Sequence, residues 1–169
     1  YEQAEAWLKK AAEKQNTEAL WWLYDLNLSI KHDSITAVTY LEQACEKNLP
    51  EALNNMGYYY AHGIIVKQDL EKATTLLHKA ASLNSGMAYN NLGNIYSAKE
   101  FTKTPDWSKA ADCFYKGAEL NCPEAIYNYS LCLKKGKGVK KDKQAAKRWL
   151  EEAAKNGSEE ALKELGKKR

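Results

Sequence analysis

The sequence is poor in the residues that break helices, and it has no long apolar run. Its 169 residues include 3 prolines and 9 glycines, and 44% are hydrophobic. Alanine, leucine, lysine and glutamate recur throughout, and no segment alternates apolar and polar residues, so helix is favoured over strand. No stretch approaches the roughly 20 consecutive apolar residues of a membrane-spanning helix. We therefore expect an all-α chain with enough apolar residues for a sizeable core and no spanning segment in the sequence given.

The sequence also has few cysteines and a small net charge. The four cysteines, Cys45, Cys113, Cys122 and Cys132, contain no CxxC pair and are too few for a disulfide scaffold. We expect four free thiols, which favours the cytoplasm, with Cys122 the most reactive because it lies at a turn before a proline. Lysine and arginine total 25 against 22 aspartates and glutamates, a net charge of +3. This mild and dispersed charge excludes a dedicated nucleic-acid-binding protein.

Classical catalytic and metal-binding patterns are missing as well. The three histidines, at positions 32, 62 and 78, have no carboxylate or thiol at ligand spacing, so we expect no metal site. No glycine-rich loop follows a strand, and the lysines between 135 and 141 belong to a connector between helices. The prediction is a protein without a cofactor and without catalytic residues.

What the sequence does contain is a repeat. Five marker alanines, Ala19, Ala52, Ala88, Ala125 and Ala161, are separated by 33, 36, 37 and 36 residues. Pairs of small residues at 11–12, 44–45, 80–81, 117–118 and 153–154 keep the same spacings. Two independent markers in one register indicate an internal structural repeat.

Capping residues recur in the same register. Asp33, Asp69, Asp106 and Asp142 each precede an alanine by four residues, and we interpret them as helix N-caps rather than catalytic acids. Asn48, Asn84, Asn121 and Gly157 are placed to end the same helices in the left-handed conformation. Pro50 and Pro123 suit the first turn of the next helix.

Each period therefore holds two antiparallel helices. The first (A) is predicted at about 17–29, 51–62, 86–98, 123–135 and 158–167, and the second (B) at about 2–14, 34–47, 70–83, 107–120 and 143–156. The repeats are then 17–49, 50–85, 86–122 and 123–157, with partial repeats at 1–16 and 158–169, in a single repeat domain spanning 1–169. Because a solenoid needs polar caps and the chain opens on a repeat body, we interpret it as a piece of a longer protein.

The glycine and alanine motifs carry a family resemblance. Leu92-Gly93-Asn94-Ile95-Tyr96, the connector Lys135-Gly136-Lys137-Gly138-Val139 and the run Ala153-Ala154-Lys155-Asn156-Gly157 resemble the Sel-one-like repeat, a relative of the tetratricopeptide repeat. The first full repeat departs from this pattern, with Leu23-Tyr24 in place of Leu-Gly and a connector about three residues shorter. The resemblance covers nearly the whole chain.

The resemblance implies a right-handed α-solenoid of about four to five two-helix repeats. It also implies a non-enzymatic adapter or scaffold, of a kind found in bacteria, that binds a peptide or protein segment in a concave groove, without nucleic acid or membrane insertion. Two alternatives stay open: an immunity or inhibitor protein for a bacterial toxin, and an accessory module of an enzyme whose catalytic part lies elsewhere. The family's cysteine-rich subgroup is disfavoured, because the cysteines here do not recur at the repeat period.

Helical geometry predicts which face meets a partner. Positions 0, 4 and 8 after each marker alanine, such as Ala52, Met56 and Tyr60, share one arc and form the packing stripe. Positions 2, 3 and 6 lie on the opposite arc. From these positions we define the A-helix ladder, the candidate partner site: Trp21, Trp22, Asp25, Asn54, Asn55, Tyr58, Asn90, Asn91, Asn94, Tyr127 and Asn128.

The ladder asparagines need an explanation. Six asparagines within helices cost about 0.5 kcal/mol each relative to alanine, or about 3 kcal/mol together. Either their amides bind a partner's backbone, or the amides of Asn55, Asn91 and Asn128 bond to the neighbouring helix and hold the stack in register. Both interpretations stay open. For Trp21, Trp22 and Tyr127 partner binding is favoured, since aromatic residues are common interface anchors, although the two tryptophans could instead contact a preceding repeat or cap.

Overall fold

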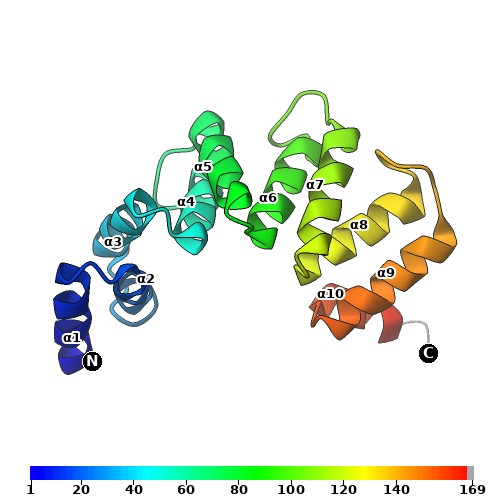
Figure 1. The fold of residues 1–169 in the computed structure, drawn as a ribbon. Helices are drawn as coiled ribbons and strands as arrows, with labels where there is room; N and C mark the ends of the chain where they lie inside the picture. Colours follow the sequence, from blue (N-terminus) through cyan, green and yellow to red (C-terminus); the bar gives the residue numbers. More distant parts are fainter. Residues whose placement is uncertain (167–169) are drawn as a thin grey trace. The chain divides into compact units, whose positions relative to one another are not determined.

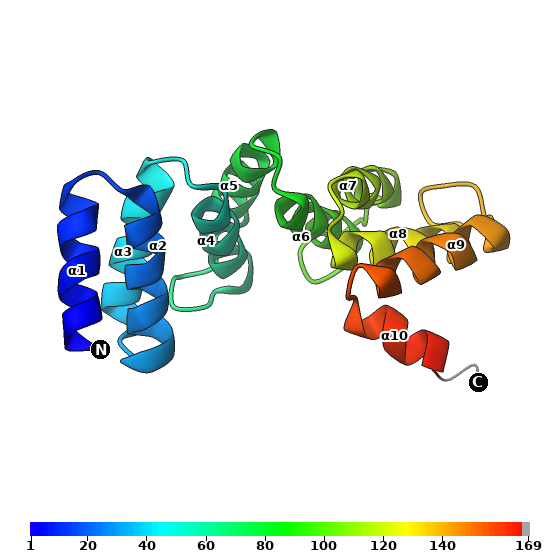
Figure 2. The ribbon, with the colours of Figure 1, turned by 60° about the horizontal axis from the view of Figure 1, so that its bottom comes forward.

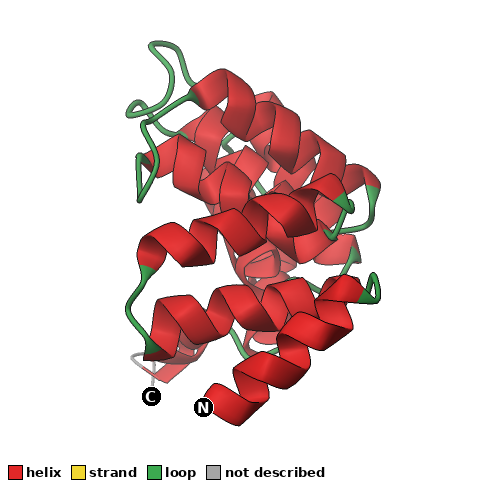
Figure 3. Ribbon diagram, turned by 90° about the vertical axis from the view of Figure 1, so that its left-hand side faces the viewer, coloured by secondary structure: helices red, strands yellow, loops and turns green. Residues whose placement is uncertain are grey.

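The computed structural model describes residues 1–166, and every regular element in that range is a helix (Figures 1 and 3). The prediction of an all-α chain is confirmed. The α-helices are α1 (Glu2–Glu13), α2 (Thr17–Asp25), α3 (Ser34–Glu46), α4 (Pro50–His62), α5 (Leu70–Ser82), α6 (Gly86–Ser97), α7 (Trp107–Glu119), α8 (Pro123–Lys135), α9 (Lys143–Lys155) and α10 (Glu159–Gly166). These bounds lie close to the predicted ones; the predicted end of the last helix, at 167, lies outside the described residues.

The chain divides into two compact units, Tyr1–Ala80 and the residues from Ala81 onward. In the first unit α1 packs on α2, α2 on α3 and α3 on α4. In the second unit α6 packs on α7, α7 on α8, α8 on α9 and α9 on α10, and the neighbouring A helices α6 and α8 also touch. Figure 2 lets these consecutive pairs be followed along the colour sequence. Packing on sequence neighbours is the arrangement of an α-solenoid, as predicted.

The predicted caps are present at the helix ends. The carboxylates of Asp33, Asp69 and Asp106 each accept a hydrogen bond of 3.0 Å from the backbone amide three residues later. Asp142 accepts from two amides, at 2.9 Å each. The predicted closing residues Asn48, Asn84, Asn121 and Gly157 all have positive φ, between 58° and 93°. The B helices therefore begin and end where local chemistry places them.

Small residues allow the helices to approach closely. The B-helix alanines four residues after each capping aspartate are buried, and so are the marker alanines of the A helices. Gly57 shows the need most directly, because a Cβ atom there would lie 2.7 Å from the Cγ of Leu77 on α5. The packing stripe predicted from helical geometry is confirmed in the first unit: Met56 is buried in a core cluster, with Tyr60 packed at its edge.

The first full repeat is irregular, as its departure from the family pattern suggested. We predicted one A helix to residue 29, but α2 ends at Asp25 and continues as a π-helical turn, Leu26–Ile30. Asn27 in this turn is buried, and its side-chain amide donates to the carbonyl of Leu23 at 2.7 Å. This bond gives the buried amide a partner within the helix. The extra residue per turn widens the helix just before the short connector.

Candidate interaction surface

In the first unit, part of the A-helix ladder is tied into a polar network between α2 and α4. The hydroxyls of Tyr24 and Tyr59 share a hydrogen bond of 2.6 Å. The amide of Asn55 donates to the Tyr24 hydroxyl at 3.4 Å, and the amide of Asn54 donates to the Asn55 oxygen at 3.3 Å. The Tyr59 hydroxyl is desolvated and bonded to Tyr24, and both effects raise its pKa. The network joins the A helices of two successive repeats.

The other ladder residues of this unit differ in how much surface they expose. Trp22 is 56% exposed and Tyr58 is 40% exposed. Trp21 is half-buried, with its ring centroid 5.2 Å from that of Tyr24. Asp25 is half-buried and accepts a hydrogen bond from Ser29 at 2.9 Å. Trp22 and Tyr58 are therefore the aromatic ladder residues most open to a partner in the first unit.

In the second unit, ladder residues pair between neighbouring A helices. The amide of Asn128 on α8 donates to the side-chain oxygen of Asn90 on α6 at 2.8 Å. The hydroxyl of Tyr127 donates to Glu164 on α10 at 3.4 Å, and Lys134 bonds the same carboxylate at 2.7 Å. In both pairs, position 2 of one repeat meets position 3 of the next. These bonds fit the interpretation that ladder residues hold the stack in register.

Burial corrects the expectation of a fully open arc. Asn54 is 7% exposed and Asn90 is 5% exposed, so position 2 is covered in these repeats. For Asn90, the neighbouring A helix α8 lies beside α6 and bonds it, and the geometry of one isolated helix does not include such a neighbour. Asn91 is half-buried and also has an interaction partner. Asn94 is half-buried and lines a hollow of about 110 Å³ with Asn128.

Nothing in the described part of the chain groups three or more histidine, cysteine, aspartate or glutamate side chains as a metal would require. All four cysteines are free. The expectation for Cys122 was wrong: it is buried as the N-cap of α8, with its thiol 3.3 Å from a Glu124 carboxylate oxygen. Burial is the main reason why the pKa of the Cys122 thiol is raised to about 11. The turn is real, but its side chain points into the core.

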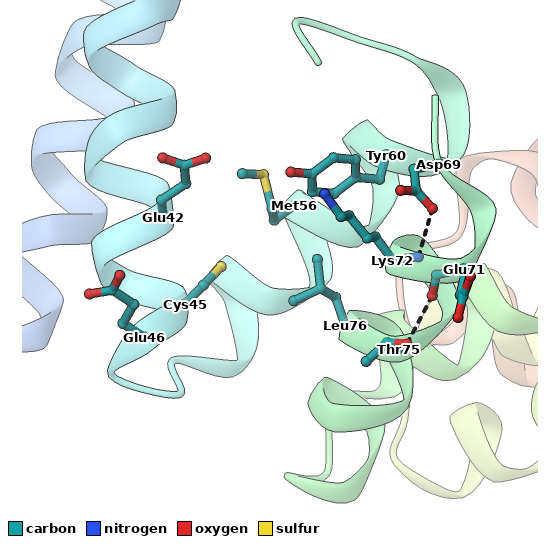
Figure 4. Close-up of a pocket in the computed structure, with 10 residues that line it drawn as sticks. All are labelled: Glu42, Cys45, Glu46, Met56, Tyr60, Asp69, Glu71, Lys72, Thr75 and Leu76. Carbon is teal, nitrogen blue, oxygen red and sulfur yellow. Dashed lines mark hydrogen bonds between the residues drawn. The ribbon is translucent and has the colours of Figure 1, made fainter. Parts of the chain in front are cut away.

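The first unit also contains a hollow that was not predicted from the sequence. It measures about 670 Å³ and lies between α3 and α5, with α4 as its floor (Figure 4). Its apolar lining comes from Met56, Leu76, Tyr60 and Cys45, whereas Glu42, Glu46, Asp69 and Glu71 supply carboxylates. The hollow is on the B-helix side, away from the ladder positions. Its members are spread over 35 residues of sequence, so no local motif marks it.

Among residues 1–166, none of the helices combines the length and the apolar character that crossing a membrane would need.

Comparison with known proteins identifies the repeat. The Sel1 repeat family matches residues 1–16, 19–49, 50–85, 86–122 and 123–158. No curated protein matches the sequence. A Sel1 repeat protein from Oxalobacter formigenes has a similar structure, with a TM-score of 0.86 and 29% identity over 98% of this chain and 68% of that one.

Two further solved structures are similar. A protective antigen of uropathogenic Escherichia coli strains has a TM-score of 0.80 and 25% identity, over 96% of this chain and 35% of its own. Helicobacter pylori cysteine-rich protein B has a TM-score of 0.60 and 28% identity, over 80% of this chain and 97% of its own. Sel1 repeats are in general protein-interaction modules. With five matched repeats that cover most of its length, this chain belongs to the Sel1 repeat family.

Proposed function

We propose that this chain is a non-catalytic adapter that binds a peptide or protein segment along its A-helix ladder, on the concave face of the solenoid. The observation that carries the proposal is the exposure of Trp22 and Tyr58 on successive A helices, at 56% and 40%. The core of the same helices is formed by other residues, such as Leu23 on α2 and Met56 on α4, which are buried. Tryptophan and tyrosine are the residues that most often dominate the energy of an interface.

The ladder divides into two roles under this proposal. Asn55, Asn90, Tyr127 and Asn128 form hydrogen bonds within the chain and keep successive A helices in register. Trp22, Tyr58 and Asn94 supply the contacts to the partner, with Asp25 at the edge. Register bonds support binding indirectly, because in the first unit they hold α2 and α4, and with them Trp22 and Tyr58, at fixed spacing before the partner arrives.

A truncation experiment tests the proposal. The immobilised chain captures a partner from an extract of its source cells, and that partner is then purified and titrated by calorimetry. The variant Trp22→Ala/Tyr58→Ala should weaken binding by about thirtyfold or more. Each aromatic anchor is expected to contribute at least about 1 kcal/mol to the binding free energy, and about 2 kcal/mol corresponds to a thirtyfold change in Kd. The variant's thermal unfolding should match the parent's, since both side chains are exposed.

The matched control is Trp7→Ala/Ile35→Ala. These side chains are 72% and 80% exposed, lie on the B helices α1 and α3, and are outside the ladder. The control should bind as the parent does. If the ladder variant binds as tightly as the parent, or if the control loses as much affinity, the ladder is not the partner site.

A further inference from the structure

Within each unit, three equivalent positions come together where two B helices flank an A helix. They lie five residues after the buried alanine of the first B helix, four after the marker alanine, and three after the buried alanine of the next B helix. In the second unit these residues are Tyr115 on α7, Tyr129 on α8 and Trp149 on α9. In the second unit, all three positions are therefore occupied by aromatic residues of the chain itself.

The three rings contact one another closely. The centroid of Tyr129 lies 5.2 Å from that of Tyr115 and 5.4 Å from that of Trp149, and the ring of Trp149 meets both in edge-on geometry. Edge-on contacts at these separations are favourable pair geometries for aromatic rings. In the second unit, the indole of Trp149 therefore packs at this place against two tyrosine rings.

In the first unit the same three positions hold Glu42, Met56 and Leu76 (Figure 4). None of these is aromatic, and the hollow of about 670 Å³ lies between them. This volume is within the range of about 300 to 1,000 Å³ that is usual for small-ligand pockets. Met56 is 3% exposed at the floor, and Leu76 and Cys45 are half-buried walls. Burial and the nearby Glu42 raise the pKa of Cys45 to about 12, so the thiol is a neutral wall.

The rim of this groove is acidic. Glu42, Glu46 and Glu71 are exposed, and within residues 1–166 their carboxylates have no hydrogen-bond or ion-pair partner. Asp69 caps α5 through the amide of Lys72. Lys72 is the lysine of the lining, and its ammonium lies 5.4 Å from the centre of the Tyr60 ring. The lining therefore holds four carboxylates and one lysine, and the charge of Lys79 also acts on the thiol of Cys45. The remaining excess of negative charge complements a cationic occupant.

We propose that the α3–α4–α5 groove is a second interaction surface, which takes an aromatic side chain from a partner segment that carries lysine or arginine beside it. The apolar floor and walls accept the ring at the place where the second unit seats Trp149. The unpaired carboxylates of Glu42, Glu46 and Glu71 meet the flanking cations. This surface lies on the B-helix side and does not depend on the ladder proposal.

The methionines provide a direct test, because the chain has only two, Met56 in the groove and Met87 outside it. The chain is labelled with ¹³C-methyl methionine and titrated by NMR with the peptide acetyl-Lys-Trp-Lys-amide. The Met56 methyl signal should shift progressively and the Met87 signal should not. The peptides acetyl-Lys-Ala-Lys-amide and acetyl-Glu-Trp-Glu-amide should shift Met56 at least about fivefold less at equal concentration, since one lacks the ring and the other carries the opposite charge.

Two variants separate the ring from the charge. Leu76→Trp places an indole where α9 has Trp149 and should abolish the Met56 shift, whereas Ile35→Trp, on an exposed face of α3, should not. Glu42→Gln/Glu71→Gln should weaken peptide binding at least about threefold, and added salt should weaken the parent similarly. The control for this charge variant is Glu18→Gln/Glu51→Gln, which changes the net charge by the same amount at exposed positions outside the groove.

The charge variant keeps the test valid even if Leu76→Trp folds poorly. The proposal is overturned if the Lys-Trp-Lys peptide leaves Met56 unchanged, if it shifts Met87 equally, or if the acidic peptide binds as well as the basic one. Sedimentation of the free chain tests whether a second copy of the chain occupies the groove instead. A dimer that Leu76→Trp dissociates would assign the groove to a second copy of the chain and overturn the proposed partner segment.

Discussion

Removing the amide of Asn128 tests whether the ladder holds the repeats in register. In Asn128→Ala, the oxygen of Asn90 loses its donor at 2.8 Å, and Asn90 is only 5% exposed. Leaving a buried acceptor unpaired costs about 1 to 3 kcal/mol. Alanine is the better helix former by about 0.5 kcal/mol, which offsets part of this cost. We therefore expect a net loss of about 0.5 to 2.5 kcal/mol in the free energy of unfolding.

The double variant Asn90→Ala/Asn128→Ala sharpens the test. It removes both partners, so no buried polar atom is orphaned, and two alanines favour the helix. The loss should then be smaller than the sum of the two single losses, and the difference is the coupling energy of the pair. Urea unfolding followed by circular dichroism measures each value, with an unchanged m-value as the check that the unfolding reaction is the same.

Asn94→Ala is the matched control on the same helix as Asn90. Asn94 is half-buried, and none of the hydrogen bonds described for the chain involves its side chain, so alanine should be neutral or stabilise by about 0.5 kcal/mol. The reasoning fails if Asn128→Ala is as stable as the parent, or if the two single losses add fully in the double variant. Either result would mean that the Asn90–Asn128 bond contributes nothing to stacking.

Three further outcomes are expected from the geometry. Asp142→Ala, which removes the cap on two amides of α9, should lower stability by about 1 kcal/mol in thermal unfolding. Gly57→Ala should destabilise by about 1 to 3 kcal/mol, since its Cβ would meet Leu77, whereas Gly166→Ala, at the same repeat position with nothing within 4 Å, should stabilise by up to about 1 kcal/mol. Burial raises the pKa of Cys45 to about 12 and those of the other thiols to about 11, so iodoacetamide at pH 8 should modify none in the folded chain and all four in denaturant; rapid modification before unfolding would contradict this.

Features that depend on local chemistry were predictable from the sequence. An aspartate before a helix finds its amide partners within three residues, as Asp33 does with Thr36. An asparagine at a helix end adopts positive φ through its own backbone, as Asn48 does. A buried alanine recurs because any larger side chain would separate the helices. The period follows from these short-range requirements, and therefore the fold class was correct without any knowledge of tertiary contacts.

Features that depend on the neighbouring repeat were harder to predict. On an isolated α6 helix, Asn90 lies on the arc opposite the packing stripe, so we expected it to be free. In the structure α8 lies beside α6 and covers that position. The residue that bonds it, Asn128, is 38 positions away, so no local pattern links the two. One signal was available: positions 2 and 3 of the ladder are both rich in amides, and a donor and acceptor pair between repeats needs that combination.

The grooves on the B-helix side show how one repeat can gain a surface without changing the fold. Between α1 and α3, the three groove positions hold Lys9, Leu23 and Tyr40 around a hollow of about 550 Å³. Its lining mixes two lysines with two glutamates, so it has no acidic excess to attract a cation. Between α7 and α9 aromatic rings occupy the place. The middle position belongs to the packing stripe and is buried, as Leu23 and Met56 are. The two B-helix positions lie outside the capping and small-residue register, so substitutions there change the size and charge of a groove while the helices keep their packing, and each groove can acquire its own occupant.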